Sequence, residues 1–439
     1  MLKKGLVIIV LLSSGSVSYG QGTSGQLAPP QTPVPAERSI EDLNLLGAAT
    51  SNPPFTDTVL GADSAFRRAL FEHGVALRVN VVPRFTINLL DGPVPEAEQR
   101  YIGHRPTFIW GLNTVFTADL RQLGLTHAQL NVGFAWRWVT WSPAGPNATP
   151  VSTLYLFKGW GNRRVEMKAG YNINDQEFVG LQVGGSSSTG AQGVYAVLPY
   201  EVGMSYYPLM APSLNFRFRG PGRTYYKTAA QRSLDAAGGQ STIDRNPSGL
   251  EFLQEGNGLL LINEVGFQRP SSAGTRQAWF RTGYLRNSTL YTNKATGEPE
   301  SGNYCAYALL DLQVRAPNRA RPTQGLYLGG SAMLVPSKFN AYDRYYEARV
   351  YQRGPFASRP TDVLTFIASY RGHSRYVTDA LAAQGKTYWS SSQSLTGTYT
   401  LHLTRGAYLS LSAGYQRGAA ITPRVDPALT TTAYLILYL

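Results

Sequence analysis

The residues of this chain that could take part in catalysis do not form a recognisable set. No Gly-x-Ser-x-Gly elbow presents a serine nucleophile, and no His-x-x-x-His spacing indicates a metal pair. Cys305 is the only cysteine, which excludes an intrachain disulfide and a cysteine-based metal site. The five histidines are scattered: His73, His104, His127, His373 and His402. We therefore expect no enzymatic activity, no cofactor and no metal.

Charged and amide side chains instead recur at every second position along several segments. In a β-strand such residues share one face, because successive side chains point to opposite sides. That face offers hydrogen-bond donors and acceptors to a polar solute, although most members of such a set are simply the wet face of a strand. The predicted lining set is Arg78, Asn80, Arg84, Arg137, Glu166, Lys168, Arg217, Arg219, Glu264, Arg281, Asp311, Arg315, Glu347 and Arg349.

The opposite face of the same segments is apolar and aromatic. In residues 129–138, Leu130, Phe134 and Trp136 share one face, and Arg137 lies on the other. Such alternation, with aromatic residues near the strand ends, is typical of a transmembrane antiparallel β-barrel. We count about 16 strands, which is the porin range. The predicted strands are residues 75–84, 108–119, 129–138, 151–160, 164–172, 200–207, 214–219, 258–268, 278–285, 310–315, 325–335, 346–350, 363–371, 394–404, 408–413 and 429–439.

The start of the chain indicates export. Lys3 and Lys4 precede an apolar run that is too short to span a bilayer, and small residues follow it, so residues 1–20 are predicted to be a secretory signal peptide. Residues 21–60 are rich in Pro, Gly and Ser and are predicted to be a poorly ordered periplasmic lead. Residues 61–439 are the predicted barrel domain. It begins with a short amphipathic helix, Asp63–His73, which ends at Gly74.

The last eleven residues, Leu429–Leu439, alternate without any charge. An exposed edge strand of this kind promotes aggregation, and closing a barrel against an earlier strand removes the edge. The segment is similar to the closing strand of outer-membrane barrels, with Leu439 where those usually end in Phe. We therefore predict the outer membrane of a Gram-negative bacterium as the location, with the barrel assembly machinery as a partner. A buried strand of a soluble sandwich is the alternative.

Longer polar inserts separate some of the strands. They are residues 184–193, 224–246, 291–303 and 374–386. Porins carry long loops on the extracellular side and short turns on the periplasmic side. One or two of these inserts are expected to fold inward and narrow a pore, and residues 225–237 are expected to form a short helix in such a loop.

Several short motifs resemble the carbohydrate-selective porins of the OprB type. They are the helical start before Gly74, Gly170-Tyr171 followed by Phe178, Glu201 to Tyr207-Pro208, and the turn from Gly354 to Asp362 that contains Arg359-Pro360. The likeness covers roughly residues 60–439. The chain departs from the family pattern in residues 390–400, which lack the acidic residues that the family usually has in the third strand from the end.

This resemblance implies an outer-membrane porin for passive diffusion of carbohydrates and small solutes. Arginine forks can then bind sugar hydroxyls, and Tyr or Trp faces can stack on sugar rings. Because basic residues outnumber acidic ones in the lining set, a general or anion-selective porin is the alternative, and an outer-membrane hydrolase is a remote one. The formal charge of +13 does not suggest nucleic acid in an exported β-protein. Expected partners are carbohydrate solutes and outer-membrane lipid, and the choice between a monomer and a homo-oligomer stays open.

Overall fold

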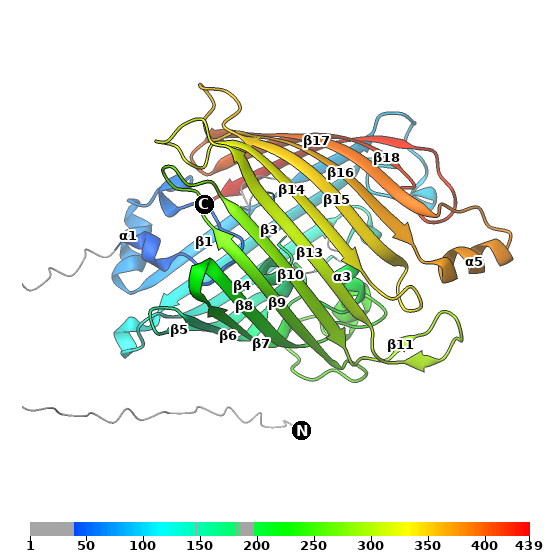
Figure 1. Ribbon diagram of the computed structural model, residues 1–439, viewed down its shortest axis with the longest axis horizontal. Helices are drawn as coiled ribbons and strands as arrows, with labels where there is room; N and C mark the ends of the chain where they lie inside the picture. The colour runs from blue at the N-terminus through cyan, green and yellow to red at the C-terminus, as the bar shows by residue number, and fades with distance from the viewer. Residues whose placement is uncertain (1–38, 146, 149, 181–182, 184–196) are drawn as a thin grey trace, which may run out of the picture. The chain divides into compact units, whose positions relative to one another are not determined.

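The computed structural model describes residues 39–145, 147–148, 150–180, 183 and 197–439, and their strands close into one antiparallel barrel (Figure 1). The strands β1 and β2 are two halves of one strand, interrupted at Val82-Pro83, and both lie between β3 and β19. Pro83 has no N–H to donate to the ladder. Counted in this way, the barrel has sixteen strands, as the sequence predicts. They are β1 (Val75–Val81), β2 (Arg84–Asn88), β3 (Thr107–Asp119), β4 (Ala128–Val139), β5 (Val151–Trp160), β6 (Val165–Asn172), β7 (Ala211–Arg219), β8 (Thr224–Arg232), β9 (Leu259–Arg269), β10 (Ala278–Asn287), β13 (Tyr304–Arg315), β14 (Gly325–Leu334), β15 (Tyr342–Arg353), β16 (Val363–His373), β17 (Ser391–Thr404), β18 (Ala407–Arg417) and β19 (Ala428–Tyr438).

The predicted closing strand is confirmed. β19 pairs with β18 along its length, from Ala428 opposite Gln416 to Leu437 opposite Ala407. Its other edge pairs with β2 and β1. Neither edge of this apolar strand is therefore left open, which is what a barrel achieves and an open sheet does not.

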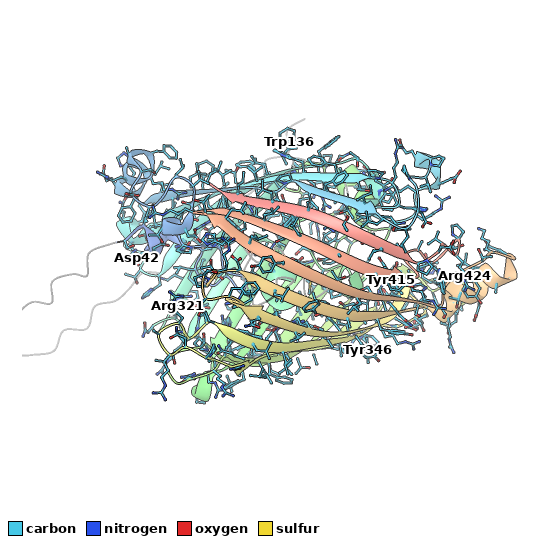
Figure 2. The ribbon with its side chains drawn as sticks, turned by 90° about the horizontal axis from the view of Figure 1, so that it is seen from above. Asp42, Trp136, Arg321, Tyr346, Tyr415 and Arg424 are labelled. Carbon is cyan, nitrogen blue, oxygen red and sulfur yellow. The ribbon has the colours of Figure 1, made fainter. Side chains whose placement is uncertain are left out.

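The alternation of side chains follows the predicted faces. Large apolar residues are exposed on the outer surface of the barrel, among them Trp136, Tyr346 and Tyr415, which Figure 2 labels. Between them, inward residues such as Asn131 and Glu347 are buried. Aromatic side chains lie outward near both ends of the strands, as the girdles of a membrane barrel do.

Two predicted elements are wrong. One predicted strand is absent and one strand that was not predicted is present, so the number of strands is unchanged. Residues 200–207, predicted as a strand, hold the end of α3 (Val197–Glu201) and an irregular segment. Residues 225–237, predicted as a helix, begin with most of β8, which pairs with both β7 and β9. The physical reason is that polar residues lie on both faces of β8, with Thr224, Thr228 and Arg232 on the outward one. Tyr225, Lys227 and Gln231 point inward, so the segment lacks the apolar alternation of a strand with one face in lipid.

The connections differ in length at the two ends of the barrel. One end, here called the short-turn end, has tight turns such as Arg405-Gly406 between β17 and β18. The other end carries the long loops, and porins place such loops outside the cell. None of the described helices is long and apolar enough to cross a bilayer. The remaining elements are α1 (Ala65–Glu72), α2 (Asn174–Phe178), α4 (Gly239–Arg245), α5 (Arg375–Ala383), the hairpin β11 (Tyr291–Thr292) and β12 (Pro299–Glu300), and the 3-10 turns η1 (Ile40–Leu43), η2 (Phe55–Asp57), η3 (Glu96–Glu98), η4 (Leu120–Leu123), η5 (Ser142–Ala144) and η8 (Pro221–Arg223).

The predicted helix before the first strand is confirmed as α1. The Ser64 side chain accepts a hydrogen bond from the backbone N–H of Arg67 and so caps its N-terminus. Gly74 follows its C-terminus with a φ of 72°, a conformation that glycine adopts without strain. The helix therefore turns sharply into β1.

Residues 39–60, here called the N-terminal segment, contact the inner face of the barrel at the short-turn end. Ile40, Leu43 and Phe55 pack against Ala76 of β1. Arg78 donates to Asn44 Oδ1 at 2.6 Å. These contacts position the segment inside the wall formed by β1 and its neighbours.

Candidate functional site

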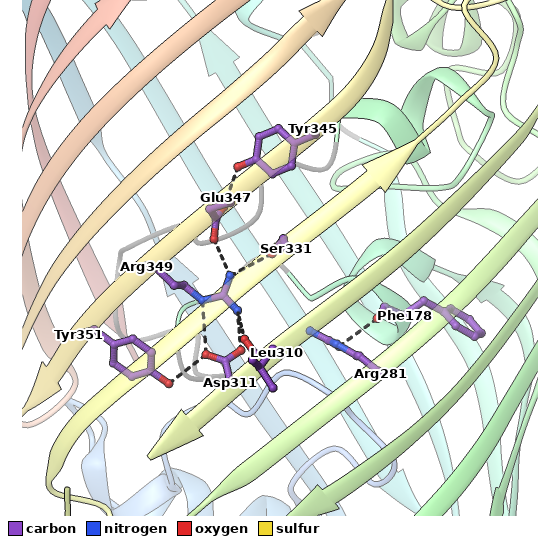
Figure 3. Close-up of polar contacts among 9 residues, drawn as sticks. All are labelled: Phe178, Arg281, Leu310, Asp311, Ser331, Tyr345, Glu347, Arg349 and Tyr351. Atoms are coloured by element: carbon purple, nitrogen blue, oxygen red, sulfur yellow. Dashed lines mark hydrogen bonds and ion pairs between the residues drawn. The ribbon is translucent and has the colours of Figure 1, made fainter. Parts of the chain in front are cut away.

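The connection between β6 and β7, here called the inward loop (residues 173–210), turns into the barrel. Arg281 of β10 donates to the carbonyl of Phe178 at 2.9 Å (Figure 3). Lys227 of β8 donates to the carbonyl of Glu177 at 2.5 Å. In the β14–β15 connection, the backbone N–H of Ala341 donates to the Glu201 carboxylate at 3.1 Å. The loop is thus fixed to the walls of β8, β10 and the β14–β15 connection. Residues 184–193, predicted as a polar insert, lie outside the described residues.

An apolar core holds the inward loop against one half of the wall. Phe178, Val179 and Met204 of the loop pack against inward residues of β9, β10, β13 and β14, including Leu260 and Met333. The run Leu259–Ile262 is a sequence indication of this arrangement, because a strand with lipid on one side and an apolar core on the other is apolar on both faces. The described part of the loop therefore fills space inside this half of the barrel.

The acidic residues of the lining set are held by basic partners. The Arg349 guanidinium lies between Asp311, at 2.6 Å, and Glu347, at 2.5 Å (Figure 3). Ser331, Tyr345 and Tyr351 complete this network. Such buried pairs fix the wall in place and neutralise one another.

The other two acidic residues of the lining set, Glu166 and Glu264, also have basic partners, and the basic residue Lys168 has an acidic one. Glu166 accepts from Arg163 at 2.6 Å and from Arg219 at 3.0 Å. Lys168 pairs with Glu177 of the inward loop. Glu264 lies 3.2 Å from Lys227 and accepts from Tyr225 and Tyr307. Lys227, Glu177 and the tyrosines were missed by the sequence analysis, because their elements were assigned to loops or their role depends on contacts between distant strands.

Other members of the lining set lie apart from these clusters. Arg217 donates to Gln268 at 3.1 Å and stacks over the ring of Tyr225. Arg78 contacts the N-terminal segment. Arg315 follows a β-bulge after Gln313, where it pairs with Leu326 and is exposed at the short-turn end. The role of each of these side chains in a passage stays a prediction.

The opposite half of the wall carries small hydroxyl side chains. On β16 to β19 the inward positions include a set of half-exposed residues, here called the hydroxyl wall: Ser369, Ser394, Thr396, Ser412, Thr430 and Thr432. Ser369 and Ser394 hydrogen-bond at 2.7 Å, and Ser412 and Thr398 at 2.9 Å. Serine and threonine are short, so among the described residues they leave space in front of this wall, and each hydroxyl can both donate and accept. Ser and Thr alternate with other residues in 392–400. This alternation indicates a hydroxyl-bearing face of a strand, but these residues are not in the predicted lining set.

Two arginines of the lining set border the hydroxyl wall. Arg84 of β2 lies opposite Tyr434 of β19, one inward position from the Thr86–Thr432 pair. Its side chain is half exposed, and its Nε has no hydrogen-bond partner among the described residues. Arg137 of β4 is also half exposed. Guanidinium, phenol and hydroxyl groups thus face the same open part of the lumen.

Two buried carboxyl groups fix the inward loop: Asp175 joins α2 to α3, and Glu201 joins α3 to the β14–β15 connection. Asp175 of α2 is fully buried and accepts a hydrogen bond from the Tyr200 hydroxyl of α3 at 2.9 Å. Burial raises the pKa of Asp175 to about 7, and the pKa of Glu201 likewise to about 7. Glu177 lies near Asp175, and Arg371 and Lys294 lie near Glu201.

These raised pKa values predict a pH-dependent inward loop. Burial favours the protonated carboxyl of Asp175, so packing of the loop is strongest in acid, weakens as the pH rises from the ordinary value of 3.8 toward 7, and changes little above that. Single-channel current is expected to fluctuate more at about pH 8 than at about pH 5. Asp175→Asn, which stays neutral, is expected to reduce this difference, and the part that remains is the contribution of Glu201. Asp379→Asn on exposed α5 is the control. Equal fluctuation of the wild-type current at both pH values contradicts the prediction.

The fold and the lumen define a porin-type channel of the outer membrane. A family model, described as "Carbohydrate-selective porin, OprB family", matches residues 140–416. The chain belongs to this family, as the resemblance implied.

Solved structures support the fold. The high-pH structure of Pseudomonas putida OprB is 14% identical, with a TM-score of 0.74, over 87% of this chain and 98% of that one. The anion-selective porin from Comamonas acidovorans is 8% identical, with a TM-score of 0.51, over 83% of this chain and 99% of that one. No curated protein matches the sequence closely enough to count as a relative. At these identities the structures show the fold alone.

Proposed function

We propose that carbohydrates cross this porin passively between the inward loop and the hydroxyl wall, with Arg84 and Arg137 as the main cationic contacts. The observation that carries the proposal is the unequal division of the lumen. One half is filled by the apolar core of the inward loop, and the other presents half-exposed hydroxyl groups. A ladder of weak, interchangeable hydrogen bonds lets a polyol advance without being trapped. The protein is exported by its signal peptide and acts as a channel, not as an enzyme.

A mild preference for anions accompanies this path. The acids Asp311, Glu347 and Glu264 are buried in ion pairs, whereas Arg84 has no ion pair among the described residues. The potential along the open half is therefore positive. This observation also favours the second candidate function, a general anion-selective porin without sugar specificity.

Replacement of Arg84 and Arg137 by Gln distinguishes the two functions. Loss of two partly exposed charged donors is expected to weaken block of the ion current by a neutral oligosaccharide by about fivefold to tenfold and to lower the anion preference. Arg217→Gln is the matched control, because its guanidinium is held by Gln268 and Tyr225. A double variant that loses anion preference but keeps its sugar block would show that these arginines serve ions alone.

A further inference from the structure

The connection between β8 and β9 folds back over the outer face of the barrel at the long-loop end. Its residues 246–256 are here called the rim loop. The hydroxyl of Tyr171, on the outward face of β6, donates to the carbonyl of Leu250 at 2.6 Å. The backbone N–H of Val151, where β5 begins, donates to the carbonyl of Ser248 at 3.2 Å. The rim loop therefore lies against the surface that faces lipid, above β5 and β6.

A buried arginine lies beneath the rim loop. Arg232, the last residue of β8, has the same outward parity as exposed Tyr226, yet only 7% of it is exposed. Its Nη1 donates to the carbonyl of Glu251. Its Nε and Nη2 are buried and have no hydrogen-bond partner among the described residues. A guanidinium has five N–H donors, and leaving buried donors unpaired is costly. The site therefore lacks an acceptor.

Exposed apolar side chains follow Glu251 on the rim loop. Phe252 is 67% exposed and Leu253 is 81% exposed. Leu259 and Leu261, at the start of β9, continue the apolar surface down the lipid-facing wall. An exposed apolar patch of this kind marks a contact with another molecule.

We propose that the rim loop binds a phosphorylated, acylated lipid of the outer leaflet. The phosphate accepts hydrogen bonds from Nε and Nη2 of Arg232, which match two oxygens of one phosphate. The acyl chains lie along Phe252, Leu253 and the outward leucines of β9. Because both nitrogens are shielded, the rim loop moves off β8 to admit the phosphate. This site is on the outer surface and does not depend on the route of sugars through the lumen.

A second copy of this chain fits the same surface less well. Stable protein interfaces bury roughly 800 Å² on each partner, far more than a few loop side chains supply. The unpaired N–H groups of Arg232 would also be stabilised by an anion, and an apolar face of a second copy does not provide one. A phosphorylated lipid supplies both the anionic phosphate for Arg232 and the acyl chains for the exposed apolar side chains.

The test uses the full-length porin in detergent, with diphosphorylated lipid A and the same lipid without phosphates as probes, and native mass spectrometry to count bound lipid. Wild-type protein is expected to retain the phosphorylated lipid about tenfold more tightly. Arg232→Gln is expected to remove this difference, and Phe252→Ser with Leu253→Ser to weaken both lipids. Arg286→Gln, an exposed outward arginine at the same end, is the control and is expected to change neither. Heat-modifiable migration on gels confirms that each variant is folded.

Two outcomes overturn the proposal. One is equal retention of the two lipids by wild-type protein, or an unchanged preference in folded Arg232→Gln. The other is a dimer of the chain that Phe252→Ser with Leu253→Ser dissociates while lipid retention stays the same, which assigns the surface to a second copy.

Discussion

Removal of residues 435–439 is expected to abolish barrel assembly. These residues form the end of β19 that meets β1 and β18, and the N–H of Leu439 donates to the carbonyl of Val79 at 2.8 Å. Without them the parts of β1 and β18 that face residues 435–439 stay unpaired, and in a bilayer each unsatisfied backbone group costs several kcal/mol. The truncated chain is expected in the periplasm, sensitive to protease, with assembled protein reduced by about tenfold or more.

Leu439→Phe is the matched variant for this truncation. It keeps every backbone hydrogen bond and introduces the aromatic residue with which such barrels usually end, so assembly is expected at the wild-type level or above. Normal amounts of heat-modifiable protein after the truncation would contradict the role of β19 as the closing strand.

Deletion of residues 39–57 is expected to leave the barrel assembled but to raise its conductance. The N-terminal segment contacts the inner wall through Phe55 and Asn44, and Gly47 lies against the inward residues Phe157 and Lys168. These contacts place the segment in the lumen at the short-turn end. Because conductance follows the open cross-section, we expect a rise of roughly twofold in single-channel recordings.

Asp57→Ala is the matched point variant. The Asp57 carboxylate accepts from the backbone N–H of Gly406 at 3.1 Å and from the Tyr408 hydroxyl, and His402 Nε2 lies 3.0 Å away. Its loss frees η2 from the β17–β18 turn, so we expect noisier current with a smaller rise in the mean. Unchanged conductance in the deletion variant contradicts a narrowing role, and loss of assembled protein shows instead that the segment guides assembly.

The barrel was predictable from the sequence because its main determinant is local. Alternation of residues such as Trp136 and Arg137 follows from a pleated strand with lipid on one side. The prediction failed where tertiary contacts replace lipid or water. β8 carries Tyr225 and Lys227 on a face that the inward loop covers, so its pattern is not that of a lipid-facing strand. In residues 200–207, Val202 and Met204 are apolar because they pack in the core of the inward loop, not because they face lipid.

The candidate site was less predictable for the same reason. The sequence places Glu347 and Arg349 on one face of a strand, but it does not show that Asp311, from another strand, pairs with Arg349. The sequence could not show that the acids are neutralised while Arg84 borders the open half of the lumen. The sequence shows the hydroxyl wall as Ser and Thr at every second position. Its role as a candidate sugar path can be inferred only from the structure, in which the inward loop fills the opposite half of the lumen.

Ion current through the unmutated porin in a planar bilayer, with increasing amounts of a neutral oligosaccharide, tests the central claim most directly. We predict a concentration-dependent and reversible block on a background of mild anion preference, because the sugar occupies the path along the hydroxyl wall that ions also use. A current that no sugar reduces at any concentration, with the anion preference intact, contradicts the carbohydrate path and leaves a general anion porin.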